Sequence, residues 1–114
     1  MTIKTPDNLK STGLPPQTIE KLHRIFAQYP EIEKICLYGS RAKGNFSSGS
    51  DIDLTIMGKK LTTTQLLAIE TQIDDLLLPY TIDLCLFEKI ENPDLVDHIQ
   101  RVGIEFYSRH AYNS

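Results

Sequence analysis

The stretch LYGSRAKGNFSSGSDIDL, residues 37–54, decides how this chain folds and what chemistry it offers. An apolar run stops at a glycine and a serine, and a polar loop then leads to two aspartates one residue apart. In the segment DIDLTIMG, apolar and polar residues alternate with the period of a strand, so Asp51 and Asp53 project to the same face. The stretch therefore predicts a strand, a turn with a short helix, and a second strand that carries paired carboxylates.

The composition is typical of one small domain. The chain has 114 residues, of which 40% are hydrophobic, enough for a single core without disulfide staples. We expect a flexible N-terminal arm over residues 1–13 and a single domain over residues 14–114. No apolar run is long enough for a membrane span or a signal peptide. Cys36 and Cys85 lie inside apolar runs and form no metal motif, which favours reduced core cysteines in a cytoplasmic protein.

Working outward from the opening stretch, apolar periodicity predicts helices and strands in alternation. The α+β fold class follows: a small mixed β-sheet with helices packed on one face, the face bearing the aspartates staying open. The apolar stripe of the second long helix runs on through Leu77, and we expect His98 to lie on the surface of the last helix. The expected helices are residues 14–30, 62–80 and 92–103, and the expected strands are residues 33–38, 51–58 and 81–88, with 104–108 as a last strand or an extended end.

Three aspartates are candidate metal ligands. Like charges as close as those of Asp51 and Asp53 resist joint ionisation unless a cation lies between them. Asp83 is the charged residue inside the apolar strand TIDLCLF, and it joins the pair if the two strands are neighbours. Three carboxylates could then hold two Mg²⁺ ions about 3.5–4 Å apart, with phosphates completing the coordination. The alternative is that all three aspartates are outward strand residues in contact with water.

The loop before the aspartates has the residues of a phosphate-binding turn. Gly39 allows close approach of the backbone to a ligand, and Ser40 can cap a short helix whose free N–H groups favour an anion. Arg41 and Lys43 could neutralise phosphate charge or could simply be solvated. Ser50 could offer a hydroxyl to phosphate, although N-capping or exposure to solvent is as consistent with its position. A Walker loop is absent.

These residues, Gly39-Ser40, the DID motif at 51–53 and Asp83, resemble the minimal nucleotidyltransferase family, which shares the palm of DNA polymerase beta. The resemblance implies a palm-like fold and transfer of a nucleoside monophosphate, AMP from ATP, to a hydroxyl with release of pyrophosphate. It also implies that Gly39 and Ser40 hold the triphosphate and that Asp51 and Asp53 bind both metals. Asp83 would bind the catalytic metal and help to deprotonate the acceptor hydroxyl.

Small stand-alone members of this family are often encoded beside a HEPN-domain protein, an RNase toxin, and look like antitoxins that place AMP on a toxin tyrosine. The resemblance therefore implies a protein partner of the HEPN type. Two alternatives stay open: a binding module that neutralises its partner by contact without catalysis, and nucleotidyl transfer to a small molecule such as an aminoglycoside. The sequence leaves open the acceptor hydroxyl, the preferred base, and whether the chain forms homo- or hetero-oligomers.

Overall fold

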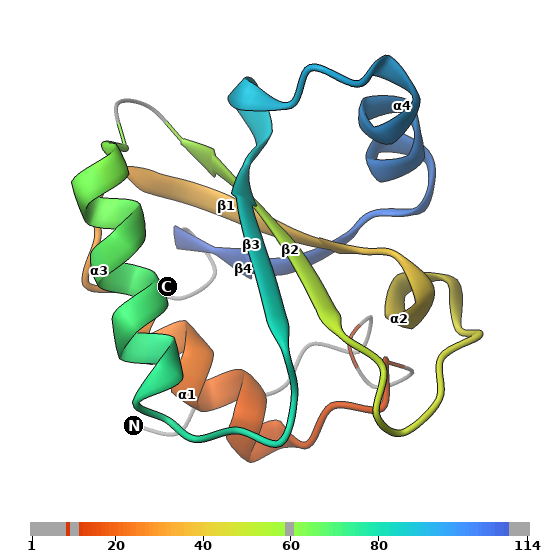
Figure 1. Ribbon diagram of the computed structural model, residues 1–114, viewed down its shortest axis with the longest axis horizontal. Coiled ribbons are helices and arrows are strands. Elements are labelled where there is room, and N and C mark those ends of the chain that lie inside the picture. The colour runs from red at the N-terminus through yellow and green to blue at the C-terminus, as the bar shows by residue number, and fades with distance from the viewer. Residues whose placement is uncertain (1–8, 10–11, 59–60, 110–114) are drawn as a thin grey trace.

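A four-stranded mixed sheet organises the chain, with the strands in the order β3-β2-β1-β4 (Figure 1). The computed structural model describes residues 9, 12–58 and 61–109. Strand β1 runs antiparallel to both β2 and β4, whereas β2 and β3 are parallel. The α+β class with a small mixed sheet is thus confirmed. The strand bounds are β1 Ile32–Tyr38, β2 Ile52–Gly58, β3 Ile82–Leu86 and β4 Ile104–Ser108.

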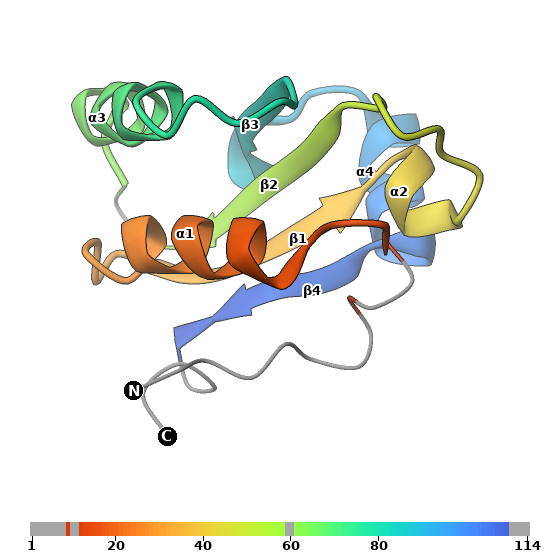
Figure 2. The same ribbon diagram turned by 90° about the horizontal axis from the view of Figure 1, so that it is seen from below.

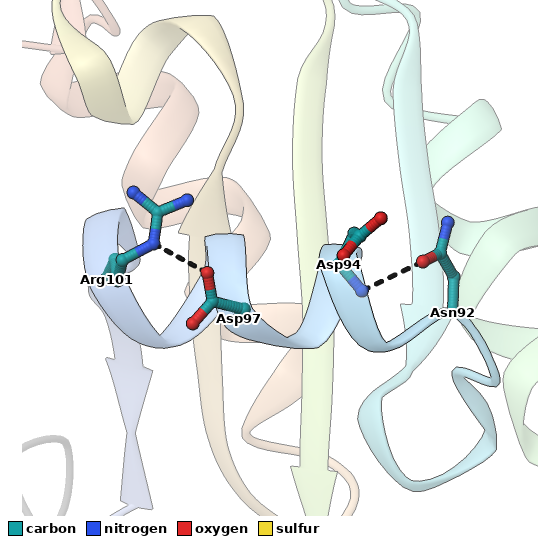
Figure 3. A network of polar contacts seen from close by, with 4 residues as sticks. All are labelled: Asn92, Asp94, Asp97 and Arg101. Carbon is teal, nitrogen blue, oxygen red and sulfur yellow. Dashed lines mark hydrogen bonds and ion pairs between the residues drawn. The ribbon is translucent and has the colours of Figure 1, made fainter.

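The helices begin where the sequence provides capping residues. Thr62 and Gln65 form a reciprocal capping box at the start of α3, and Asn92 Oδ1 accepts a hydrogen bond of 2.9 Å from the Asp94 N–H at the start of α4 (Figure 3). A proline at the first helical position also starts α1 and α4. The bounds are α1 Pro16–Phe26, α2 Ser40–Lys43, α3 Thr63–Asp74 and α4 Pro93–Val102, with a 3₁₀ turn, η2, at Phe87–Lys89.

The main core lies between the sheet and the helices α1 and α3. Both helices cover the face of β2 that carries Ile52 and Leu54, and these two side chains are fully buried. Figures 1 and 2 show α1 and α3 together on that side of the sheet. The apolar half of the strand alternation therefore packs as expected.

Helix α4 departs from the arrangement that the sequence suggests, because it covers part of the opposite face. Ile99 packs with Cys36 and Tyr38 of β1, and Leu95 and Cys85 border the same small cluster. Helix α4 and this second cluster cover part of the aspartate-bearing face. The rest of that face, beside α4, stays open. An amphipathic stripe predicts that a helix buries one side, but it does not predict against which face of a sheet the helix packs.

Two further segments differ from expectation or lie outside the described residues. Helix α3 ends at Asp74, and Leu77 has a φ of 54° and is 88% exposed, so it is no part of the buried stripe. Most of the expected arm, residues 1–13, lies outside the described residues, but Leu9 and Thr12 are buried. Within the described ranges, no helix has the length and apolarity that crossing a membrane requires.

Candidate active site

Two of the predicted aspartates are direct neighbours across the sheet. Asp53 of β2 and Asp83 of β3 are register partners, and Tyr38 of β1 is the partner of Asp53 on its other side. Neighbouring strands lie about 4.8 Å apart, so the two carboxylates start from adjacent points of one face. Asp51 directly precedes β2 and is exposed. The structure therefore brings the three aspartates to one end of the β2–β3 pair.

The three carboxylates form a zone of uncompensated negative charge. Burial raises the pKa of Asp53 above its usual value, the charges of Asp83 and then Asp51 raise it further, and His98 would oppose them when it is protonated. The ion pairs found among the described residues lie elsewhere, between Arg24 and Glu20 and between Arg101 and Asp97. A cation brought to this end of the sheet would therefore relieve existing repulsion.

The aspartates do not form a ready-made metal cage. Among the residues that the structure describes, no three or more His, Cys, Asp or Glu side chains converge closely enough to hold an ion. Mg²⁺ needs only one or two carboxylates when waters and substrate phosphates fill its other positions. The adjacent carboxylates of Asp53 and Asp83 fit that donor set. Binding of two ions by all three aspartates stays a prediction.

Position 39 requires a glycine for two reasons, the backbone conformation there and the closeness of the Asp53 side chain. Its φ of 77° lies in the left-handed region, and a Cβ at this position would overlap Oδ2 of Asp53. Gly39 is the N-cap residue of α2, which corrects the expectation that Ser40 caps this helix. Ser40 is instead the first helical residue, and its hydroxyl makes none of the hydrogen bonds found in the described part of the chain. The Ser40 hydroxyl thus stays available to a ligand.

Arg41 is buried, being 1% exposed, and its side chain is directed to the protein backbone. The guanidinium donates to three backbone carbonyls: Nε to Ser50 at 3.1 Å, Nη1 to Thr12 at 2.8 Å and Nη2 to Ser48 at 3.2 Å. It also lies 4.9 and 5.0 Å from the ring centroids of Phe46 and Tyr80. Arg41 therefore fixes the loop between α2 and β2, which does not favour its predicted contact with phosphate.

The Ser50 hydroxyl is hydrogen-bonded within the protein, whereas the Lys43 side chain is exposed. Ser50 Oγ accepts a hydrogen bond of 2.9 Å from the Ser47 N–H, and the two hydroxyls lie 3.2 Å apart. The Ser50 hydroxyl is thus engaged in a local turn, which does not favour its predicted contact with phosphate. Lys43, the last residue of α2, is exposed and makes none of the ion pairs found among the described residues. Contact of Lys43 with phosphate stays a prediction.

Sequence analysis did not identify two residues at this site, His98 and Tyr38. His98 Nε2 accepts a hydrogen bond of 3.2 Å from the Gly39 N–H, and its ring lies edge-on to Tyr38 with centroids 6.2 Å apart. The Tyr38 hydroxyl lies 3.6 Å from Cys85 Sγ, and burial together with Cys85 and the two strand aspartates raises the pKa of Tyr38 well above its usual range. Strand alternation could have placed Tyr38 on the face of the aspartates. The place of His98 could not be predicted without knowing which face of the sheet α4 covers.

A cavity of about 540 Å³ adjoins the carboxylates along the free edge of β3. Asp83 and Tyr38 border it at the site, and the rest of its wall is largely apolar, formed by α3, β3, and the segment from η2 into α4. A second cavity, about 380 Å³, lies around Tyr80 at the start of β3, and none of the three aspartates lines it. The apolar residues of the first wall are Leu66, Leu84, Leu86, Ile90 and Leu95.

Comparison with solved structures gives relatives of the same fold. The chain is similar to a toxin–antitoxin crystallised with AMP-PNP, with TM-score 0.63 and 22% identity over 83% of this chain and 74% of that one. It is also similar to the MntA-HepT toxin–antitoxin (TM-score 0.61, 15% identity, 87% and 77% covered). A tri-AMPylated Shewanella oneidensis HEPN toxin in complex with its MNT antitoxin gives TM-score 0.60 and 15% identity, with 85% and 75% covered.

A search of curated proteins finds no match. The model of the family described as polymerase beta, nucleotidyltransferase matches residues 20–112, which include the Gly-Ser turn and all three aspartates. The match spans most of the chain and agrees with the mixed sheet, the Gly39–Asp53 contact and the Asp53–Asp83 pairing. This protein therefore belongs to the polymerase beta nucleotidyltransferase family.

Proposed function

We propose that this protein is a Mg²⁺-dependent nucleotidyltransferase that moves AMP from ATP to a hydroxyl group. One observation carries the proposal: Asp53 and Asp83 lie side by side on parallel strands, and the Asp53 carboxylate lies directly against the glycine of a Gly-Ser turn. Paired carboxylates beside a Gly-Ser turn suit phosphoryl-type transfer, which depends mainly on positioning and on neutralising charge. Bound Mg²⁺ would supply that neutralisation.

The residues of the chain take separate roles in this transfer. Gly39 allows the triphosphate to approach the backbone, and the Ser40 hydroxyl donates to a phosphate oxygen. Asp51, Asp53 and Asp83 would hold the Mg²⁺ ions. Asp83 accepts the proton of the acceptor hydroxyl. The new bond joins the acceptor oxygen to the α-phosphorus, the bond from the α-phosphorus to the bridging oxygen breaks, and pyrophosphate leaves with that bonding electron pair.

The acceptor that we propose is a tyrosine of a HEPN-type toxin, with this protein as its antitoxin. Support comes from the similar solved structures, which are toxin–antitoxin complexes and include a tri-AMPylated HEPN toxin. The cavity of about 540 Å³ beside Asp83 also has room and apolar wall enough for an aromatic side chain. A tyrosine entering there would bring its hydroxyl toward Asp83.

The test is incubation of the protein with Mg²⁺ and ATP labelled at the α-phosphate, with and without a HEPN-type toxin as the partner. We expect label on a tyrosine of the partner, and loss of that label in Asp53→Asn and Asp83→Asn. Glu33→Gln, which changes an exposed carboxylate on β1 away from the site, is the matched control. If the toxin is neutralised without transfer of label, and equally by the Asp variants, the protein acts by contact alone and the proposal fails.

A further inference from the structure

We infer that His98 is a positioning residue of the nucleotide site, holding the Gly-Ser turn in place from helix α4. The inference rests on the proposed function in that the turn is taken to receive a triphosphate. His98 Nε2 accepts the hydrogen bond from the Gly39 N–H at 3.2 Å, so the ring carries its proton on Nδ1 in this contact. Gly39 and His98 are 59 residues apart in the chain, and the bond joins two separate elements.

Gly39 is held from two sides. On one side its α-carbon lies against the Asp53 carboxylate with no room for a Cβ, and on the other its amide is bound by His98. Glycine is the most flexible residue, so contacts with surrounding residues are needed to hold Gly39 in this one conformation. His98 therefore sets the position of Ser40, the next residue, as well as the distance between the turn and Asp53.

The ring of His98 is itself fixed. It lies edge-on to Tyr38 at an interplanar angle of 81°, and the neighbouring Ile99 is buried in the cluster beneath α4. Figure 1 shows α4 above α2, with both helices on the side of the molecule toward which β1 runs. Helix α4 thus acts as a rigid support from which one side chain reaches the turn.

Two variants separate the hydrogen bond from the packing of the ring. His98→Gln keeps an acceptor oxygen at a reach close to that of Nε2 but has no ring, whereas His98→Phe keeps a ring against Tyr38 but has no acceptor. Gln100→Ala, at an exposed position of the same helix, is the control. Affinity for Mg²⁺ with a non-hydrolysable ATP analogue is measured by calorimetry, and exchange of the Gly39 amide proton is measured by NMR without nucleotide.

We expect the Gly39 amide to be protected in the wild type, the Gln variant and the control, and to exchange faster in the Phe variant. Affinity for the ATP analogue should fall about fivefold in the Phe variant, the effect of one net hydrogen bond, and stay within about twofold in the other two. Thermal stability should not follow this order, because Phe preserves the packing better than Gln.

Three results would overturn the inference. An unprotected Gly39 amide in the wild type would show that the contact is absent in solution. Equal affinity in the Phe variant would show that the contact does not position the turn. Tighter binding in that variant would show that His98 competes with phosphate for the amide. A protected amide in a protein that binds no nucleotide would instead refute the proposed function, because the amide is measured without ligand.

Discussion

Asp53 is under opposing demands from folding and from function. Burial and two neighbouring carboxylates raise its pKa, so its charged form destabilises the folded state. We predict that Asp53→Asn abolishes nucleotidyl transfer and at the same time stabilises the fold. The gain should be below about 1 kcal/mol, because solvent screens a carboxylate that is only partly buried. Urea denaturation of both proteins, in the absence of metal, measures it.

The sign of this effect can be checked against pH. A carboxyl group with a raised folded-state pKa contributes stability below its unfolded pKa of about 3.9 and loses that contribution as pH rises through the folded value. The advantage of Asp53→Asn over the wild type should therefore be absent in acid and appear as pH rises. A variant that is less stable than the wild type at neutral pH would show that the Asp53 carboxylate supports the fold.

His23 gives a second prediction that depends on pH, away from the site. It is 4% exposed in the core, and its Nε2 donates a hydrogen bond of 2.6 Å to the Phe106 carbonyl. Burial lowers the pKa of His23 below 6.5, and the bond to Phe106 offsets part of that shift. Below about pH 6.5 the unfolded chain takes up a proton that the folded chain resists, so stability falls as pH drops.

We predict that His23→Gln, which keeps a donor, removes this acid-dependent loss although it lowers stability at neutral pH. The measurement is the free energy of unfolding between about pH 7 and pH 5, the range in which histidine normally titrates. The same slope in the variant and the wild type would assign the acid sensitivity to other groups.

At the level of elements, α2 and its following loop contain two cations with separate duties. Arg41 is buried and bonded to three carbonyls, whereas Lys43 is exposed. We predict that Arg41→Ala costs about 3–5 kcal/mol of folding stability, because it leaves the buried Thr12 carbonyl and two partly buried carbonyls unpaired. It also removes a buried side chain from between Phe46 and Tyr80. Lys43→Ala should change stability by less than about 0.5 kcal/mol but weaken ATP binding.

The paired variants are compared by urea denaturation and by nucleotide titration. Similar stability of Arg41→Ala and the wild type would contradict the structural role of Arg41. Unchanged ATP affinity in Lys43→Ala would remove Lys43 from the proposed phosphate contacts.

The sequence predicts the strands and the common face of their aspartates well, because strand alternation is a local property. The pairing of Asp53 with Asp83 needed only the assumption that β2 and β3 are neighbours. Arg41 could not be assigned in the same way, because one of its acceptors is the carbonyl of Thr12, 29 residues earlier. His98 was missed for a similar reason, since its role depends on which face of the sheet α4 covers.

Across the whole molecule, the two faces of one sheet serve different purposes. One face, with α1 and α3, holds the core that makes a chain of this size stable. The other face is shared between a small cluster under α4 and the carboxylates, with the cavity of about 540 Å³ along the β3 edge. The chemistry therefore lies where the second face is left uncovered.

Comparison of ATP labelled at the α-phosphate with ATP labelled at the γ-phosphate tests nucleotidyl transfer most directly. The protein is incubated with each, together with Mg²⁺ and the HEPN partner, and labelled protein is separated from free nucleotide. Label should pass to the partner only from the α-phosphate, and only when Asp53 and Asp83 are intact. Transfer from the γ-phosphate, or transfer that survives Asp83→Asn, would contradict nucleotidyl transfer by the carboxylates of β2 and β3.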